Sequence, residues 1–160
     1  LVGATAAIKW PNDVLIGERK LAGVLCETRS RGDGRGATVV GIGLNLAPRW
    51  DQDSVSLPLA TGARAPIGLD EVGTPPTPLD TLTSLRRYLL EAAGLLAAGT
   101  WQPVLAAIRD RDALRGRRIR VETATAVHLG TAQGLSDDGA LRLVTPSGEI
   151  ALASGHVEPA

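Results

Sequence analysis

The chain has 160 residues. Its 44% hydrophobic content is enough to bury a core, and 21% charged residues argue against a disordered segment. Its 17 basic and 17 acidic residues balance, so the overall charge does not favour nucleic acid or an anionic membrane as a partner. No apolar run approaches the roughly 20 residues that a transmembrane helix requires, so no membrane association is expected.

Two rare residue types, cysteine and methionine, bear on the cellular compartment of the protein and on whether the sequence is a part of a longer one. Cys26 is the single cysteine, which excludes an internal disulfide framework and predicts a reducing, cytoplasmic location. The apolar strand pattern around it predicts a buried thiol rather than a reactive one. The sequence contains no methionine and begins at Leu1, so we expect it to be the carboxy-terminal part of a longer protein.

A strand followed by a hairpin is predicted near the amino terminus. The strand covers Ala6–Trp10 and ends at Pro11, because the residue before a proline is driven to extended geometry. The hairpin joins short apolar runs at 14–16 and 21–25 through a polar turn. It contains Lys20, one of two lysines against fifteen arginines. Since a compact ammonium differs from a planar guanidinium, a retained lysine marks a candidate site, although chance would also leave lysines somewhere.

Residues 37–46 form a nearly continuous apolar run, which predicts a central strand covered on both faces. Gly41 and Gly43 stand at alternate positions and leave one face without side chains, and Asn45 has the same parity. Such a face can admit a ligand at close range. It can equally admit a packed helix, with Asn45 capping a local turn, and the run alone does not separate the two interpretations.

Two helices are predicted after a long irregular connection over 48–76, a kind of segment that is often functional or mobile. The first begins with Thr77 as its cap, Pro78 at its first position and Asp80 in its first turn. Its apolar residues recur at helical spacing and predict a stripe that faces the core: Leu82, Leu85, Leu89, Ala93 and Leu96. Gly99 ends this helix, and a second core helix follows directly.

Four short segments near the carboxy terminus alternate polar and apolar residues, with turn signals between them: 118–122, 126–135, 140–144 and 149–153. They predict a small antiparallel barrel or sandwich of about fifty residues. A basic cluster stands at its start: Arg115, Arg117, Arg118 and Arg120. No aromatic residue accompanies this cluster to stack on bases, so we interpret it as a solvated strand edge rather than a nucleic-acid site.

Three motifs together resemble the central signature of biotin–protein ligases. They are Lys9-Trp10-Pro11-Asn12-Asp13-Val14, then Lys20-Leu21-Ala22-Gly23-Val24-Leu25 with Glu27, then Val40-Gly41-Ile42-Gly43-Leu44-Asn45. The first two at this spacing are highly specific, whereas the carboxy-terminal segment matches in general pattern only. The resemblance implies an α+β fold. Residues 1–112 would form a mixed β-sheet flanked by helices, the class II synthetase-like biotin–lipoate ligase fold with its N-terminal part missing. Residues 113–160 would form a small SH3-like β-barrel.

The resemblance implies an ATP-dependent ligase that converts biotin to biotinyl-5'-AMP with Mg²⁺. It then transfers the biotin to one lysine of a biotin carboxyl carrier protein domain. Lys20 matches the family lysine that reaches the biotin carbonyl and the phosphate, and it is the expected catalytic residue. A positioned ammonium and a metal ion offset the repulsion between a carboxylate and a phosphate chain. Substrate and nucleotide binding is expected at Asn12, Asp13, Lys20, Ala22, Gly23, Gly43 and Asn45, and no protein metal ligand is expected.

Parts of the family's site are not in this sequence. The glycine- and arginine-rich loop that folds over the adenylate should precede residue 1, as should the polar residues that hold the biotin head group. The run 32–36 has a similar composition but follows the first motif instead of preceding it. We therefore expect the full-length gene product to be a ligase and these 160 residues alone to be inactive or nearly so. The resemblance also allows a homodimer.

Two other functions stay open. A lipoate or octanoate ligase-type acyltransferase is the nearest enzymatic alternative, because that fold relative also uses a lysine beside an acyl group or acyl-adenylate. A bifunctional ligase and transcriptional repressor would carry a DNA-binding helix-turn-helix upstream, and no such motif lies within these residues. A purely structural module is disfavoured by the two lysines and the glycine-bare strand.

Overall fold

The computed structural model describes residues 5–30, 32, 36–47 and 65–160. They fall into two compact units. The first contains the described part of 1–6 and 12–76, and the second contains 7–11 and 77–160. The expectations for the first residues, for the turn around 31–35 and for most of the connection 48–76 lie outside the described residues.

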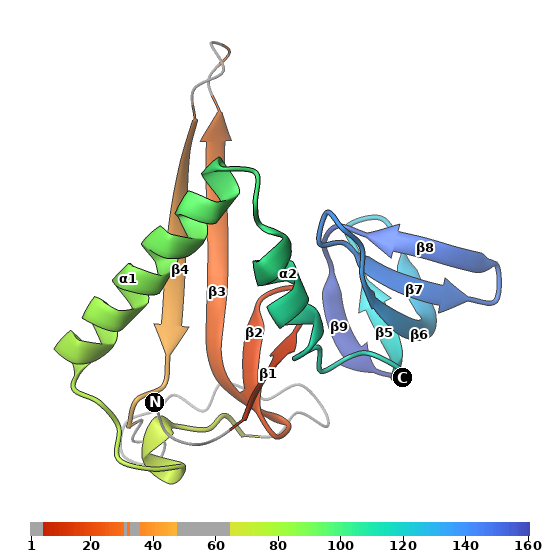
Figure 1. Cartoon of the computed structure of the whole chain (residues 1–160). Coiled ribbons are helices and arrows are strands. Elements are labelled where there is room, and N and C mark those ends of the chain that lie inside the picture. The colour runs from red at the N-terminus through yellow and green to blue at the C-terminus, as the bar shows by residue number, and fades with distance from the viewer. Residues whose placement is uncertain (1–4, 31, 33–35, 48–64) are drawn as a thin grey trace. The chain divides into compact units, whose positions relative to one another are not determined.

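The first unit is built on three antiparallel strands, β2 (Asp13–Ile16), β3 (Arg19–Ser30) and β4 (Gly36–Leu44). β3 pairs with β2 at one edge and with β4 at the other, and Figure 1 shows β3 and β4 as a long ribbon pair. Gly17 has a φ of 59°, which a residue with a side chain rarely adopts, so it makes the tight turn between β2 and β3. The predicted hairpin is confirmed.

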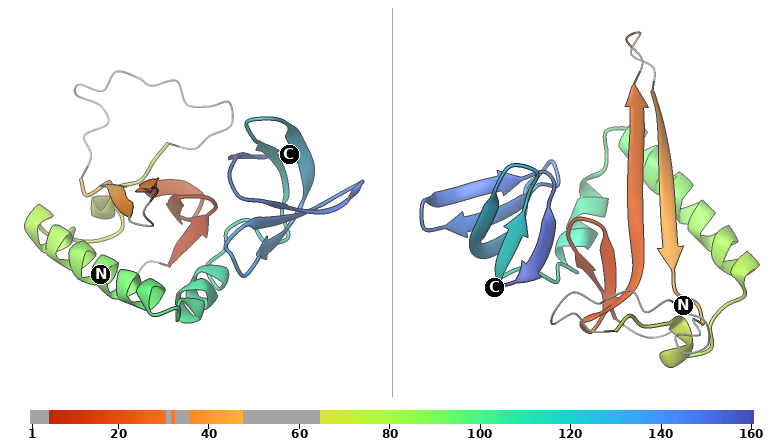
Figure 2. Two further views of the ribbon diagram at one scale, coloured as in Figure 1. Left: turned by 90° about the horizontal axis from the view of Figure 1, so that it is seen from above. Right: turned by 180° about the vertical axis from the view of Figure 1, so that it is seen from behind.

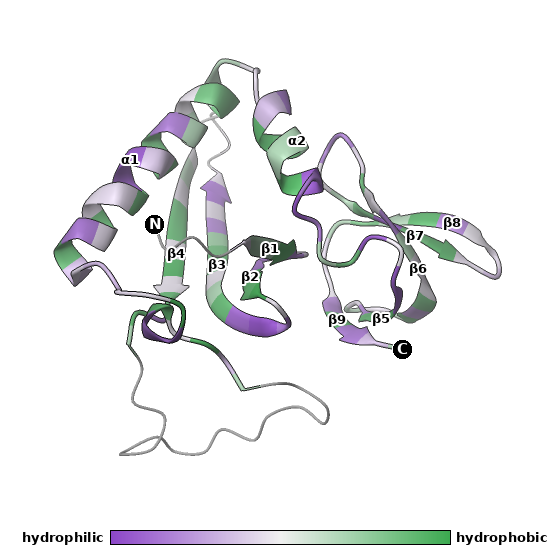
Figure 3. Ribbon diagram, turned by 60° about the horizontal axis from the view of Figure 1, so that its bottom comes forward, coloured by the Kyte–Doolittle hydropathy of each residue, from purple (hydrophilic) through white to green (hydrophobic). Residues whose placement is uncertain are grey.

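An irregularity in the β2–β3 pair lies beside the residues of interest. Val14 pairs with Ala22 but Leu15 pairs with Lys20, so Leu21 is an extra residue in β3. Leu21 is buried against Ile67 and Leu69, the latter in the short 3₁₀ helix η1 (Leu69–Glu71). This small core fixes the start of β3. Figure 3 shows β3 to be apolar in its middle and hydrophilic at both ends.

β4 is not covered on both faces by the described residues. The sequence prediction of a strand with two covered faces is therefore wrong for this part of the chain. β4 pairs with β3 alone among the strands that the structure describes, and Val39 is 66% exposed. Cys26 of β3 is exposed as well, so the predicted buried thiol is also wrong. An apolar run indicates that a strand can be covered, whereas its actual burial depends on which other segments pack against it.

In the second unit, the end of β1 (Ala6–Lys9) is tied to the chain that follows the helices. Ile8 donates a backbone hydrogen bond to Arg111 O at 2.7 Å and accepts one from Ala113 N at 2.8 Å. Trp10, which follows β1, is only 6% exposed, and its Nε1 donates to Gly139 O at 3.2 Å. The tryptophan of the first motif is therefore a core residue of the second unit.

Five antiparallel strands complete this unit, in the order β8-β7-β6-β5-β9. They are β5 (Arg118–Glu122), β6 (Val127–Leu135), β7 (Leu141–Thr145), β8 (Gly148–Leu152) and β9 (His156–Pro159). Figure 2 shows them curving around a common core, in which Val121, Leu141 and Leu143 have no exposed surface. The four predicted strands are confirmed, and β9 was not predicted. The boundary between residues 112 and 113 stays a prediction, because contacts also group Trp10 and both helices with these strands.

The first helix begins and ends where the local signals predict, whereas the second begins at Gln102, after Trp101, instead of at Thr100. α1 (Pro78–Ala97) starts at Thr77, whose Oγ1 accepts from Asp80 N at 3.2 Å, and Gly99 follows its end with a φ of 67°. α2 (Gln102–Arg109) buries Leu105 completely. The predicted core stripe of α1 is wrong for the described residues, because Leu82, Leu89, Ala93 and Leu96 are exposed and Leu85 is only half-buried.

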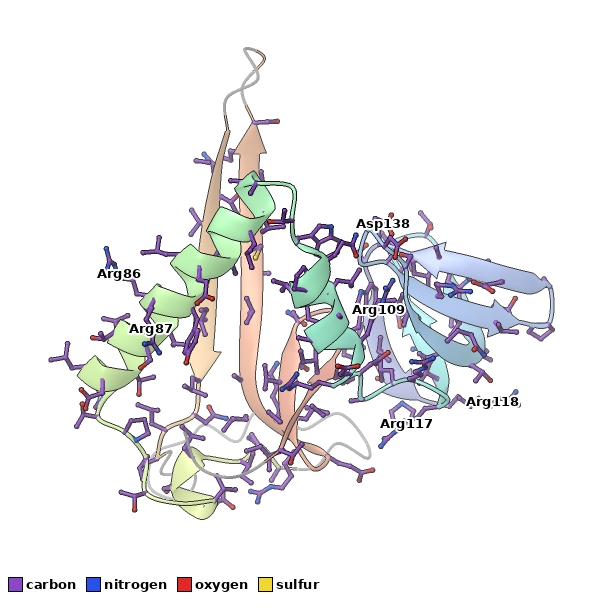
Figure 4. All side chains as sticks on the ribbon, in the orientation of Figure 1. Arg86, Arg87, Arg109, Arg117, Arg118 and Asp138 are labelled. Carbon is purple, nitrogen blue, oxygen red and sulfur yellow. The ribbon has the colours of Figure 1, made fainter. Side chains whose placement is uncertain are left out.

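The basic cluster of the second unit is mostly solvated. Figure 4 shows Arg117 and Arg118 pointing away from the strands. Arg120 Nη1 lies 3.0 Å from Glu122 Oε2 and 3.2 Å from Glu158 Oε2, so its charge is balanced within the strands. In the part of the chain that the structure describes, no helix combines the length and apolar character needed to cross a membrane.

Candidate active site

Lys20 stands near the start of β3, directly before the extra residue Leu21. Its Nζ lies 2.5 Å from Asp13 Oδ1 across the hairpin. The ammonium lies over Gly23, which pairs with Asp13, and a Cβ at residue 23 would lie 3.2 Å from Nζ and 3.3 Å from Cε. A side chain there would push the lysine aside. Glycine at this position therefore leaves the space that the end of the Lys20 side chain occupies.

Asp13 is held mainly by charge. Its Oδ1 is buried and has no aligned hydrogen bond from the described residues, although the Lys20 ammonium is within contact distance. Electrostatic attraction depends on separation more than on the angle that defines a hydrogen bond, so the ion pair is the interaction that compensates this oxygen. The side chains of Lys20 and Asp13 are 50% and 20% exposed, so the ammonium keeps one side open to solvent and to a ligand.

An open hollow of about 500 Å³ lies beside this lysine. It is lined by Lys20, Leu21, Ala22 and Gly23 of β3, by Gly43 and Leu44 of β4, and by Asn45 and Pro66. Gly43 pairs with Gly23, and a Cβ at residue 43 would meet no atom within 4 Å. Gly43 thus leaves open room over β4, while the end of the Lys20 side chain lies over Gly23. The volume is within the usual range of about 300–1,000 Å³ for small-molecule sites.

Asn45 joins β4 to the segment that closes one side of the hollow. Its Nδ2 donates to Ile67 O at 3.2 Å and to Lys20 O at 3.4 Å. Its backbone N donates to Leu21 O at 3.0 Å, and Leu69 N donates to its carbonyl at 3.0 Å. Asn45 therefore orders the chain around Lys20 through its amide group, besides lining the hollow.

Five of the seven predicted site residues line this one hollow: Lys20, Ala22, Gly23, Gly43 and Asn45. Asp13 joins them through its ion pair with Lys20. Asn12 does not line the hollow; its side chain is exposed, and its carbonyl accepts from Val24 N at 2.9 Å. The first motif is thus divided, with Trp10 in the core of the second unit and Asp13 beside Lys20 in the first.

Arg19 and Glu71 were not predicted from the sequence. Arg19 Nη1 donates to Glu71 Oε2 at 2.6 Å, and Nη2 donates to Oε1 at 3.0 Å. Arg19 also donates to Ala65 O at 3.0 Å and to Pro66 O at 2.7 Å. The hydrogen bonds from Arg19 and from the backbone N–H of Gly68 lower the pKa of the Glu71 carboxyl. No local signal could have linked residues 52 positions apart across an irregular connection.

Carboxylates, histidines and cysteines do not gather into a metal centre here. Over residues 5–30, 36–47 and 65–160, no group of three such side chains could hold a metal ion. Asp13 is the carboxylate closest to the lysine, and the ion pair already engages it.

The protein-family model for the "Biotin/lipoate A/B protein ligase family" matches residues 2–45, and the model for the "Biotin protein ligase C terminal domain" matches residues 115–158. The chain belongs to the biotin protein ligase family. The α+β fold class expected from the sequence is confirmed, with antiparallel pairing of β2, β3 and β4.

Individual relatives agree with this assignment. The chain is 36% identical to a biotin–[acetyl-CoA-carboxylase] ligase of Paracoccus denitrificans over 155 residues, which are 96% of this chain and 63% of that protein. It is 31% identical to the bifunctional ligase/repressor BirA of Escherichia coli, over 93% of this chain and 47% of that protein. The fold matches the Aquifex aeolicus biotin protein ligase in complex with biotin and ATP at a TM-score of 0.77 and 23% identity, covering 98% and 62% of the two chains. The chain thus spans less than two thirds of each of these relatives.

Proposed function

We propose that the full-length gene product is an ATP-dependent biotin–protein ligase. It would join the biotin carboxylate to the α-phosphate of ATP, release pyrophosphate, and pass the biotin from the adenylate to a lysine amine with release of AMP. The observation that carries the proposal is the Lys20 ammonium held over Gly23 at the edge of a hollow that Gly43 leaves open. Supporting it, two relatives named as biotin–[acetyl-CoA-carboxylase] ligases match 96% of this chain.

Lys20 is the proposed catalytic residue, because the first reaction brings two anions together. As the carboxylate attacks phosphorus, negative charge grows on the phosphate oxygens, and a fixed cation stabilises that charge. Asp13 would orient the ammonium until the substrate competes for it. Ala22, Gly23 and Gly43 would let the substrates approach the backbone, and Asn45 would hold the wall of the hollow. Asn12 would bind from outside this hollow, because it is exposed and does not line it.

Magnesium belongs to the proposal as a companion of the nucleotide. Mg²⁺ usually keeps several waters and is bound by one or two carboxylates together with substrate phosphates. Asp13 is the carboxylate beside Lys20 that could take part in such binding once a substrate draws the ammonium away from it. Bound in this way, Mg²⁺ would neutralise phosphate charge, while Lys20 would act on the reacting carboxylate and α-phosphate.

The proposed macromolecular partner is the biotin carboxyl carrier domain of a carboxylase. The name of the Paracoccus relative, an acetyl-CoA-carboxylase ligase, supports this choice. The balanced charge gives this segment no general attraction to nucleic acid. A reducing cytoplasm as the location fits the single cysteine, and a homodimer stays compatible with the fold. Similarity to the bifunctional BirA protein makes a ligase that also represses transcription the second candidate.

The decisive experiment is substrate-dependent pyrophosphate release by the full-length gene product. Biotin with ATP and lipoate with ATP are compared at equal concentrations, followed by transfer to a purified carrier domain. The proposal expects release and transfer with biotin and at most a trace with lipoate. Equal or greater activity with lipoate would replace the biotin assignment by the lipoate alternative. A separate operator-binding assay tests the repressor function.

A further inference from the structure

We infer that Arg19 and Glu71 are positioning residues, which lock the segment 65–71 against the start of β3 and thereby hold Lys20 in the hollow. The inference rests on the proposed function, because Lys20 is the group being positioned. Neither residue lines the hollow, and neither belongs to the motif residues to which a role was assigned above. The pair would act through the backbone on either side of the lysine.

The first part of the argument is the geometry of Arg19. Its guanidinium makes four hydrogen bonds, two to the Glu71 carboxylate and one each to Ala65 O and Pro66 O. A planar fork with several fixed donors can satisfy this set of acceptors, whereas a lysine ammonium cannot span them with the same geometry. Glu71 Oε1 also accepts from Gly68 N at 3.1 Å, so the pair fixes the segment at several points.

The second part is the connection from this segment to Lys20. Ile67 N donates to Lys20 O at 2.9 Å, and Asn45 Nδ2 bridges Ile67 O and Lys20 O. Pro66, whose carbonyl Arg19 holds, is itself part of the wall of the hollow. Adjacent residues of a strand point to opposite faces, so Arg19 can hold the segment while Lys20 reaches across to Asp13. The backbone of the lysine is thus fixed from outside the hollow.

The third part of the argument concerns Leu21, the extra residue of β3. It makes the start of β3 dependent on the support that segment 65–71 provides. Because of Leu21, the regular pairing with β2 is interrupted next to Lys20. Lys20 O accepts from Ile67 N, which lies in the segment 65–71 that the Arg19–Glu71 pair, here called the clamp, holds in place. Leu21 O accepts from Asn45 N, which continues the pairing of β3 with β4. If segment 65–71 were released, Lys20 would therefore become mobile before β3 unfolded.

The test is steady-state kinetics of biotinyl-adenylate formation by the full-length gene product with Glu71→Gln, Arg19→Lys and the double variant. A matched control is available in the second unit, where Arg142 Nε lies 2.6 Å from Glu149 Oε1 in a similarly exposed ion pair. We expect kcat to fall by about 10- to 100-fold in Glu71→Gln and Arg19→Lys, since a displacement of about 1 Å can cost about a hundredfold. The KM values should change less, and Glu149→Gln should keep the wild-type kcat.

Hydrogen exchange provides a readout that does not need activity. Exchange at the Ile67 amide should accelerate in both clamp variants and stay unchanged in Glu149→Gln, with the amides of β7 as an internal reference. Clamp variants that retain wild-type kcat, or that lose kcat with unchanged exchange at Ile67, would overturn the inference. A wild-type protein that does not activate biotin would instead refute the proposed function, and exchange at Ile67 would then test the clamp as a structural device.

Discussion

The two units use their apolar residues differently. In the second unit, strands that alternate polar and apolar residues enclose a core in which Val121, Leu141 and Leu143 are fully buried. In the first unit, β4 is almost continuously apolar, yet most of it is exposed, and Gly23 and Gly43 replace side chains where a core would otherwise form. The comparison separates a unit with a closed core from one whose described strands leave a hollow beside Lys20 open.

The largest expected effect is on the core of the second unit. Trp10→Ala removes a side chain that is 6% exposed and that donates a hydrogen bond to Gly139 O. Loss of a buried aromatic side chain typically costs about 3–5 kcal/mol, so the free energy of unfolding should fall by that amount. Denaturant titration of the full-length protein provides the measurement. A loss below about 1 kcal/mol would contradict the place of Trp10 in the core of the second unit.

The next prediction compares a glycine of the second unit, Gly130, with a glycine of the first unit, Gly43. A Cβ at residue 130 would collide with the carbonyl of Val144 and lie 2.9 Å from Leu143 Cγ, whereas a Cβ at residue 43 would meet open space. Gly130→Ala should therefore reduce the free energy of unfolding by about 1–3 kcal/mol, the usual cost of overpacking. Thermal melts measure the shift. An unchanged melting temperature would contradict the tight packing of β6 against β7.

Gly43→Ala should have the reverse profile, with little change in melting temperature and weaker substrate binding. The added methyl group would project into space that the substrates are proposed to occupy. We expect KM for biotin or ATP to rise by roughly 10-fold, which corresponds to about 1.4 kcal/mol of binding free energy. Steady-state kinetics measures this change. Unaltered kinetics would place the substrates away from the floor formed by β3 and β4.

Local signals were sufficient for much of the fold. Turn residues marked the β2–β3 hairpin, Thr77 marked the start of α1, and period-two alternation marked β5 to β8. Burial was harder to predict, because a periodic pattern does not reveal which segments supply the cover; the exposed faces of β4 and α1 and the exposed Cys26 follow from this. β9 was missed because it has four residues, the last of which is a proline.

The motifs singled out residues that the structure brings together. Lys20, Ala22, Gly23, Gly43 and Asn45 line one hollow, and their roles in binding or catalysis stay predictions. The remaining contributions depend on the three-dimensional structure. The extra residue Leu21 is visible only in the strand register, and the Arg19–Glu71 pair joins segments on either side of an irregular connection. The exposure of Asn12 could not be inferred either, because the motif divides between two units.

The smallest expected effect is a pH dependence confined to the first unit. Arg19 and the Gly68 N–H hold the pKa of Glu71 below its usual range, so the carboxylate contributes stability above its unfolded-state pKa. That contribution is lost as the pH falls through the lowered folded-state pKa. Acid titration of Ile67 amide exchange should therefore show a transition at acidic pH that Glu71→Gln removes. An identical profile in the variant would assign the acid transition to other carboxylates.

The central claim is tested most directly by Lys20→Arg in the full-length gene product, assayed for biotin-dependent pyrophosphate release alongside a thermal melt. The substitution keeps the positive charge but replaces the compact ammonium over Gly23 with a broad guanidinium. By analogy with the loss of a donor that stabilises transition-state charge, the rate should fall by about a hundredfold or more while the melting temperature stays near the wild-type value. A rate close to wild type would contradict the account.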